Sequence, residues 1–372
     1  MSCFLLFPLT FTFSRPESGG LAGFLFDSLG KFDKPFNQAP SLHIALLVIL
    51  WDCYSRHTPA RLRPVLHGWF ALIGVSVLTT YQHHVLDIPT GALLGFVCLW
   101  LWPEDASSPL AAARLTRDPR RRRLAVLYAA GAILCALPAI GWGNVALWLL
   151  WPAVSLALVA GNYALFGAAG FQKAADGHIS PAALWLFAPY RLGARLNVRL
   201  WTRADPPTVA LTTGFLTNTP RANPPLANPP RANSPLATGP LTNTPLAGAV
   251  SLGRFPSHAT ARGFATVIDL CAELPRPGAH PRYRAFPLLD LIPPAPDQLR
   301  PIVAAIEQGR AAGPVLVCCA LGYGRSAAAC AAWLLATGQA QDAGDAFAMI
   351  QGVRPRAVLH DGTRDAIQAA AE

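Results

Sequence analysis

The sequence predicts a multi-domain chain, in which an all-α bundle of about five transmembrane helices precedes a cytoplasmic α/β domain. Hydrophobic residues make up 52% of the 372 residues and charged residues only 13%. An ordinary soluble domain is about a quarter charged. The long apolar stretches all lie before residue 172, whereas beyond residue 249 short β-rich runs alternate with amphipathic helical patterns. That alternation is typical of a mainly parallel α/β sheet.

Five apolar stretches approach the roughly 20 residues that a helix needs to cross a bilayer. They run over residues 41–55, 65–82, 86–103, 124–141 and 145–168. No Lys, Arg, Asp or Glu occurs from Leu124 to Gln172, and the segment Gly141–Asn144 divides this run into two helices. Each stretch is therefore a predicted membrane span.

The positive charge of the chain is clustered between these stretches. The net charge is +10, and basic groups occur in residues 56–63, 114–123 and 173–203. Basic loops of membrane proteins stay in the cytoplasm, so the three groups indicate a multi-pass protein of the bacterial inner membrane with a cytoplasmic C-terminal domain. The groups lack the interleaved aromatic side chains of a single-strand binder, and we expect no nucleic-acid partner.

Two predicted spans begin on the outer face with histidine. One start reads Pro-Ser-Leu-His43 and the other reads His83-His-Val-Leu-Asp87. Polar residues at span ends are often merely interfacial, but His83 and Asp87 are four residues apart and share a helix face. A carboxylate can orient an imidazole and stabilise its cation, and a second histidine can protonate a leaving alkoxide. A nucleophile with an orienting carboxylate and an acid is a constellation for phosphoryl transfer.

This pattern resembles the type 2 phosphatidic acid phosphatase superfamily, and more closely its branch of inositolphosphorylceramide and sphingomyelin synthases. The resemblance covers residues 1–105. It implies that His83 is a nucleophile that forms a phosphohistidine, that Asp87 orients it, and that His43 is the general acid. These roles would serve a lipid phosphatase or a phospho-headgroup transferase at the outer face.

The chain departs from the superfamily pattern at two places. The first motif has only Arg15-Pro16 and no preceding Lys, and Val77 stands where the superfamily has an Arg. The family fold has about six spans, with the first motif after the third. The resemblance therefore implies an N-terminally shortened bundle and a partner that supplies the missing spans.

Three segments connect the two halves of the chain. Residues 106–170 hold two further predicted transmembrane helices. Residues 171–205 combine aromatic side chains with an arginine at every fourth position, which is typical of an interfacial segment on the cytoplasmic leaflet. Residues 206–248 contain six proline-centred pentads over 218–247, and proline at this density prevents helix and sheet formation. We expect an extended or structureless linker.

The region 249–372 is predicted to be one α/β domain. Strands are expected at Thr266–Leu270, Tyr283–Leu288 and Pro314–Cys318. Helices are expected at Gln298–Gly309, Ser326–Ala336, Asp342–Gln351 and Asp361–Ala371.

The strongest functional signal is the run Cys319-Ala-Leu-Gly322-Tyr-Gly324-Arg325-Ser326 between a predicted strand and a predicted helix. Backbone N–H groups of such a loop converge on an anion, and the helix start adds its positive dipole end. The glycines permit a tight backbone path, and Arg325 can bind phosphate oxygens bidentately. The same field favours a thiolate at Cys319, which predicts a nucleophile for phosphorus.

A thiolate that attacks a phosphate ester needs an acid for the leaving oxygen. Asp290 follows the predicted strand Tyr283–Leu288 and is the candidate. Asp269 lies inside a strand, where a structural role is expected, and Asp297 is expected to cap the next helix. The Ser326 hydroxyl would stabilise the departing thiolate.

Residues 249–372 resemble the dual-specificity branch of the protein tyrosine phosphatases. The resemblance implies that Cys319 is the nucleophile, Arg325 the phosphate clamp, Ser326 the thiolate partner and Asp290 the general acid. Where the family has a His before the nucleophile, this chain has Cys318, which we interpret as a small buried residue. The order of the two likenesses resembles bacterial fusions of a phosphatidic-acid-phosphatase-type membrane domain with a dual-specificity phosphatase.

The function predicted first is therefore a membrane-anchored phosphatase that uses the cytoplasmic cysteine site on a phosphorylated lipid or protein. The outer-face histidine site is the alternative catalyst. A third reading is a phosphate-sensing binding module on a degenerate membrane anchor. We expect membrane lipids as partners, and neither a cofactor nor a metal ion.

Overall fold

The computed structural model describes the chain in two compact units. The described residues are 19–21, 23–25, 28, 40–80, 83–85, 87–104, 108–211 and 249–372. The first unit comprises residues 1–115, 125–172 and 180–189, and the second comprises 116–124, 173–179 and 190–372. Arg15-Pro16 and the pentads at 218–247 lie outside the described residues.

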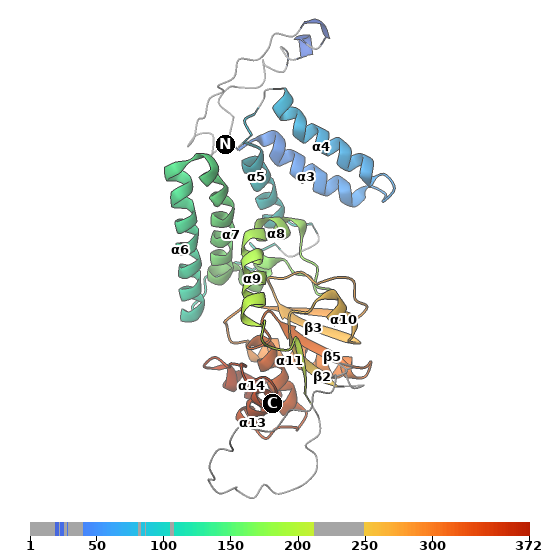
Figure 1. Cartoon of the computed structure of the whole chain (residues 1–372), viewed down its shortest axis with the longest axis vertical. Helices are drawn as coiled ribbons and strands as arrows, with labels where there is room; N and C mark the ends of the chain where they lie inside the picture. The colour runs from blue at the N-terminus through green and yellow to red at the C-terminus, as the bar shows by residue number, and fades with distance from the viewer. Residues whose placement is uncertain are drawn as a thin grey trace, which may run out of the picture. The chain divides into compact units, whose positions relative to one another are not determined.

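In the described part of the first unit, helices cover most of each stretch that the sequence predicts as a span. Its helices are α3 (Leu42–His57), α4 (Arg63–Thr79), α5 (Asp87–Leu101), α6 (Pro119–Trp142, which begins in the second unit), α7 (Leu150–Gly161) and α8 (Pro181–Leu186). A 3-10 turn, η1 (Asn144–Leu149), precedes α7, and the π turn η2 (Asn162–Phe166) and the 3-10 turn η3 (Gly167–Phe171) continue it. Figure 1 shows these elements in the blue and green part of the chain.

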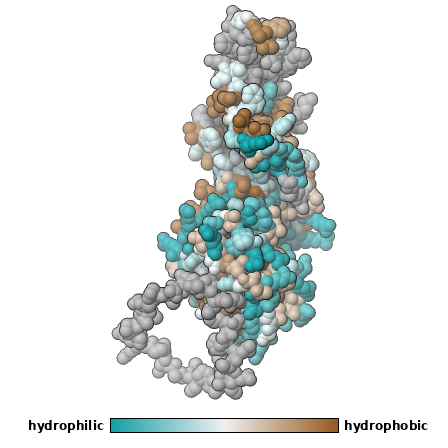
Figure 2. Space-filling model, turned by 90° about the vertical axis from the view of Figure 1, so that its right-hand side faces the viewer, coloured by the Kyte–Doolittle hydropathy of each residue, from teal (hydrophilic) through white to brown (hydrophobic). Residues whose placement is uncertain are grey.

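Two of the described helical runs are long and apolar enough to cross a membrane. They are Pro119–Trp142 and Val145–Phe171. Many of their side chains are exposed, including Ile140, Trp142 and Val145 at 77%, 78% and 83%. Figure 2 shows that hydrophobic residues, coloured brown, reach the surface of the molecule on the face in view. Helices α3, α4 and α5 have 16, 17 and 15 residues, so the five-span bundle stays a prediction.

Helices α3 and α5 cross closely because α5 carries two glycines on one face. A Cβ atom at Gly91 would lie 2.5 Å from the Ser41 carbonyl oxygen, and one at Gly95 would lie 2.8 Å from the Ala45 oxygen. Small residues four apart allow such contacts between helices. The crossing brings the first turn of α5, which starts at Asp87, next to the first turn of α3.

The second unit is built on a five-stranded sheet with the order β1-β2-β5-β3-β4. The strands are β1 (Thr208–Leu211), β2 (Val250–Arg254), β3 (Thr266–Cys271), β4 (Tyr283–Leu288) and β5 (Val315–Cys319). All neighbours are parallel except β1, which pairs with β2 in the antiparallel sense. The three predicted strands are present. Strand β1 lies in residues 206–248, which the sequence predicts to be a linker. The strand was not predicted, because four residues after a pair of prolines carry no periodic signal.

Helices pack around this sheet in the orange and red part of Figure 1. They are α10 (His258–Arg262), α11 (Pro296–Arg310), α12 (Arg325–Ala336), α13 (Ala343–Val353) and α14 (Thr363–Ala371). Helix α12 contacts β5 and α11, α13 and α14, and its alanine-rich turns are buried. Its small side chains place the helix close to the sheet, which fixes the loop between β5 and α12. The N-cap of α11 is Ala295 rather than Asp297, which lies in the first turn.

Helix α9 (Ala188–Trp201) lies within the predicted interfacial segment. Ala194 and Val198 pack against the cluster of Cys271, Leu274 and Ala320 in the second unit. On the opposite side, Leu192, Leu196 and Leu200 are 70%, 55% and 54% exposed. The helix is amphipathic, and its apolar stripe faces away from the unit that it packs against.

Candidate active sites

The loop from Cys319 to Arg325 joins the end of β5 to the start of α12, as the sequence predicted. Cys319 is 2% exposed. Its Sγ atom lies 3.2 Å from the Ser326 hydroxyl and accepts a hydrogen bond of 3.3 Å from the Gly322 backbone N–H. Both groups can donate hydrogen bonds to a thiolate, which is the form of cysteine that attacks phosphorus.

The two loop glycines differ in their φ angles and in the space that a Cβ atom would have. Gly322 has a φ of +76°, and a Cβ atom there would lie 2.7 Å from the backbone of Gly253 and Arg254. Gly324 has a φ of −110°, and a Cβ atom would meet open space. The tight backbone path therefore requires glycine at Gly322, whereas no close neighbour requires it at Gly324.

Arg325 is held by a carboxylate that the sequence did not reveal. Its Nη1 and Nη2 atoms donate to the two oxygens of Glu273 at 3.0 and 2.8 Å, and Nη1 also donates to the Leu288 carbonyl at 2.9 Å. Both side chains are buried. Burial alone would raise the pKa of Glu273, but the paired guanidinium lowers it overall. The only sequence signal was a Glu two residues after the predominantly apolar strand Thr266–Cys271.

One donor of Arg325 remains unused. Among the described residues, the buried Nε of Arg325 has no hydrogen-bond partner. An unpaired buried donor costs about 1–3 kcal/mol. A phosphate oxygen in the loop would satisfy this donor.

Asp290 lies beside the same guanidinium. Its Oδ1 atom is 3.0 Å from Nη2 of Arg325, and its side chain is 37% exposed. The next residue, Leu291, has a φ of +59°, a left-handed conformation that costs about 1–2 kcal/mol for such a residue. Strain of this kind is concentrated at functional sites, and here it shapes the turn that carries the predicted acid.

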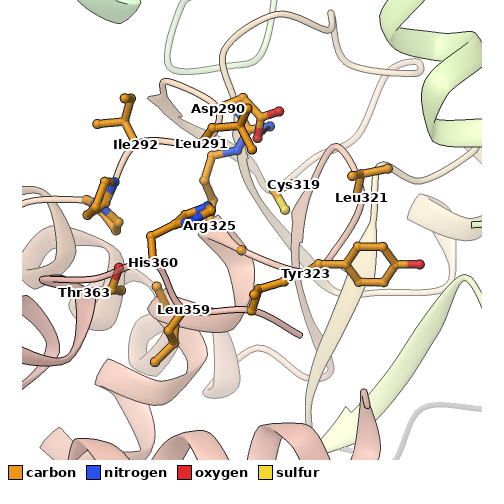
Figure 3. Close-up of a pocket in the computed structure, with 15 residues that line it drawn as sticks. Asp290, Leu291, Ile292, Cys319, Leu321, Tyr323, Arg325, Leu359, His360 and Thr363 are labelled. Atoms are coloured by element: carbon orange, nitrogen blue, oxygen red, sulfur yellow. Dashed lines mark ion pairs between the residues drawn. The ribbon is translucent and has the colours of Figure 1, made fainter. Parts of the chain in front are cut away.

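A cavity of about 120 Å³ opens over the loop. Figure 3 shows Asp290, Cys319 and Arg325 between the other residues that line it. The other walls are mainly apolar and include Leu291, Ile292, Pro293, Leu321 and Leu359. The cavity thus joins a phosphate-binding floor to walls suited to an apolar group.

Residues next to the Cys319–Arg325 loop are buried or hydrogen-bonded in ways that support it. Cys318 is fully buried, and burial raises the pKa of its thiol well above the usual value, as expected for a small core residue. The Tyr323 hydroxyl donates to Asp205, and Arg354 lies 5.1 Å from the Tyr323 ring. Arg354 also donates to the Leu321 carbonyl at 3.1 Å. The segment after α9 is therefore part of the support of the loop.

The first unit brings its three predicted residues together. His43 Nδ1 lies 3.3 Å from His83 Nε2, and His83 Nδ1 lies 3.3 Å from Asp87 Oδ2. The Asp87 carboxylate also accepts a hydrogen bond of 2.9 Å from the His84 backbone N–H. His83 and Asp87 are buried. The Asp87 contact can orient the His83 ring, with His43 at its far nitrogen.

No group of three or more His, Cys, Asp or Glu side chains in the described part of the chain is arranged to hold a metal ion.

No protein-family model matches the chain, and no curated protein matches it. Solved structures match about a third of it. Human DUSP28 is 29% identical over 34% of this chain and 93% of its own, with a TM-score of 0.30. A mouse putative dual specificity phosphatase complexed with zinc tungstate is 26% identical over 37% and 92%, with a TM-score of 0.29. PTPMT1 in complex with PI(5)P is 18% identical over 33% and 89%, with a TM-score of 0.30.

Of these three matched structures, the mouse protein is named as a putative dual specificity phosphatase. The resemblance predicted for residues 1–105 stays a prediction.

Proposed function

We propose that this chain is a membrane-anchored phosphatase that hydrolyses phosphomonoesters through a phosphocysteine at Cys319. The observation that carries the proposal is the loop itself. One turn of backbone holds the Cys319 sulfur against the Ser326 hydroxyl and the Gly322 N–H, beside a buried Arg325 with an unpaired Nε.

The reaction has two steps. The Cys319 thiolate attacks phosphorus, the ester P–O bond breaks, and Asp290 gives its proton to the leaving oxygen. Water then attacks the phosphocysteine, with Asp290 as the base that takes its proton, and the P–S bond breaks. The thiolate leaves with stabilisation from Ser326, and inorganic phosphate is released. Arg325 and the loop N–H groups stabilise the equatorial oxygens in both steps.

The substrate we favour is a lipid phosphate with a single phosphate group. The cavity walls are mainly apolar, and residues 319–326 contain no Lys to match a highly charged inositol headgroup. Tethering to a bilayer raises the local concentration of a lipid substrate. A phosphoprotein is the alternative substrate.

Membrane anchoring is supported by two kinds of element. Two helical runs are long and apolar enough to span a bilayer. Helix α9 adds an exposed stripe of three leucines, and each follows an arginine in the sequence: Arg191, Arg195 and Arg199. Such a helix suits the surface of an anionic membrane. We propose a multi-pass protein of the bacterial inner membrane with the second unit in the cytoplasm.

The deciding experiment compares three forms of the full-length protein in detergent on an aryl phosphate. We expect Cys319→Ser to abolish hydrolysis and His83→Ala to retain most of it. Vanadate and thiol alkylation should each block the wild-type activity. Loss of activity in His83→Ala with retention in Cys319→Ser would overturn the proposal. Phosphate binding without turnover in the wild type would instead support a sensing module.

A second catalytic function is proposed for the first unit, because His43, His83 and Asp87 form a continuous chain of contacts. In this reaction His83 attacks phosphorus to form a phosphohistidine, and His43 protonates the leaving alkoxide. The test uses phosphatidic acid or another lipid phosphate in vesicles, with Cys319→Ser as the background. Acid-labile protein phosphorylation that His83→Ala removes would support it, and its absence in both forms would exclude it.

A further inference from the structure

The segment Lys173–Ile179, here called the clip, follows the second long apolar run after a single residue, Gln172. Lys173 and Ile179 form an antiparallel bridge, and the Ala174 N–H donates to the His178 carbonyl at 2.8 Å. The clip lies along the edge strand β4, where the Ala285 N–H donates to the Ala175 carbonyl at 2.7 Å. The connection from the predicted membrane anchor is thus built into the catalytic sheet.

The clip inserts a lysine into the interior of the second unit. The Lys173 side chain is inaccessible to solvent, and its ammonium donates to the Asp269 carboxylate, to the Cys271 carbonyl at 2.5 Å and to the Leu274 carbonyl at 2.6 Å. All three N–H donors are therefore used. Asp269 also accepts from the Tyr283 hydroxyl at 2.7 Å. Burial alone would lower the pKa of Lys173, but Asp269 raises it overall, so the ammonium stays charged.

The two carbonyl groups that Lys173 binds belong to residues on both sides of Glu273. Glu273 is the carboxylate that holds Arg325 through two hydrogen bonds. A buried ion pair adds little stability over a well-packed apolar pair, so stability alone is a weak reason for a lysine here. Its three directed bonds do fix the path of residues 271–274.

We propose that Lys173 is a positioning residue, which holds the Cys271–Leu274 turn so that Glu273 presents Arg325 to the phosphate. Phosphate binding by Arg325 would then depend on the clip, which is the segment that follows the predicted membrane anchor. This inference rests on the proposed phosphatase function at Cys319.

The test uses the full-length protein and two variants of the pair. Lys173→Met leaves Asp269 buried without its ammonium partner and is expected to lower the melting temperature. The double variant Lys173→Met/Asp269→Asn removes both charges and is expected to recover most of the melting temperature. If Lys173 positions Glu273, the double variant should bind vanadate and inorganic phosphate about tenfold more weakly than the wild type, even though its melting temperature has recovered. This loss is smaller than the loss expected when a group that donates directly to the transition state is removed.

A double-mutant cycle identifies the route of the effect. In the Glu273→Gln background, the further change Lys173→Met/Asp269→Asn is expected to weaken vanadate binding by less than about twofold, because residues that act through one another are not additive. His178→Ala is the matched control in the same clip. Its ring is 63% exposed and pairs only with Asp176 among the described residues, so vanadate affinity should not change.

Each result decides between the two claims. Absence of Cys319-dependent hydrolysis in the wild type would overturn the proposed function itself. If the wild type is active but the folded double variant keeps vanadate affinity within about twofold, the positioning role is wrong. Failure of both variants to fold would also overturn it, because Lys173 would then be required for folding alone.

Discussion

Arg325 bonds to two carboxylates with different surroundings. Glu273 is buried and makes two hydrogen bonds with the guanidinium, whereas Asp290 is partly exposed and forms an ion pair with it. The buried carboxylate is suited to holding the arginine in place. The exposed carboxylate is suited to moving toward a leaving oxygen when phosphate replaces it at the guanidinium.

Replacement of the acid tests the role of Asp290. Asp290→Asn keeps the size of the side chain but removes the proton donor. We expect the rate of aryl phosphate hydrolysis to fall by roughly 10²–10⁴, the range for a lost general acid. A phosphate ester with an acidic leaving group needs less protonation, so the rate of its hydrolysis should fall by a smaller factor in Asp290→Asn. Equal losses for acidic and basic leaving groups would argue against Asp290 as the acid.

The pKa of Glu273 predicts how stability responds to acid. Because this pKa is lowered in the folded protein, the contribution of Glu273 to stability is present above its ordinary value of 4.5 and is lost as pH falls through the folded value. Glu273→Gln should destabilise the second unit by about 3–5 kcal/mol at pH 7, the cost of breaking a buried pair. On acidification, the melting temperature of the Glu273→Gln variant should then fall less than the melting temperature of the wild type. A parallel fall in both proteins would contradict the assignment.

At the scale of elements, the β5–α12 loop depends on a close backbone approach to β2. Gly322 lies against Gly253 and Arg254 of that strand, while Gly324 faces open space. The loop therefore has one position that only glycine can occupy and a nearby glycine without that restriction. These two positions form a matched pair.

Alanine at each glycine should have opposite consequences. Gly322→Ala meets backbone atoms and requires a strained φ, so we expect a loss of about 1–3 kcal/mol of stability and of most phosphatase activity. Gly324→Ala should retain activity within a few-fold. Melting temperature and aryl phosphate turnover, measured on both variants, check this. Comparable damage at the two positions would mean that open space at Gly324 is needed by the substrate.

At the scale of the whole molecule, the topology that we propose would put the two proposed sites on opposite sides of a membrane. The basic groups in residues 56–63, 114–123 and 173–203 predict one topology. In this topology the His43 site faces outward and Cys319 is in the cytoplasm, where a reducing environment preserves a free thiol.

A reporter fused after Glu372 tests this topology. We expect a reporter that works only in the cytoplasm to be active and one that works only in the periplasm to be inactive. A second fusion, in the segment Gly141–Asn144 between the two long apolar runs, should give the opposite pattern. Periplasmic activity after Glu372 would exclude the proposed topology.

The sequence alone determined those features that depend on short spacing. The run from Cys319 to Ser326 lies within one loop, and His83 and Asp87 lie within one helical turn, so local geometry brings their side chains together. The strands Thr266–Cys271 and Tyr283–Leu288 were also predictable, because β-rich apolar runs indicate buried strands.

Only the tertiary structure revealed the groups that act at long range. Glu273 is 52 residues from Arg325 and Lys173 is 96 residues from Asp269, and no periodicity relates such positions. Strand β1 gains its conformation from pairing with β2 rather than from its own four residues. The sequence therefore determined which residues can react, while packing of the sheet against the clip decided which residues hold them in place.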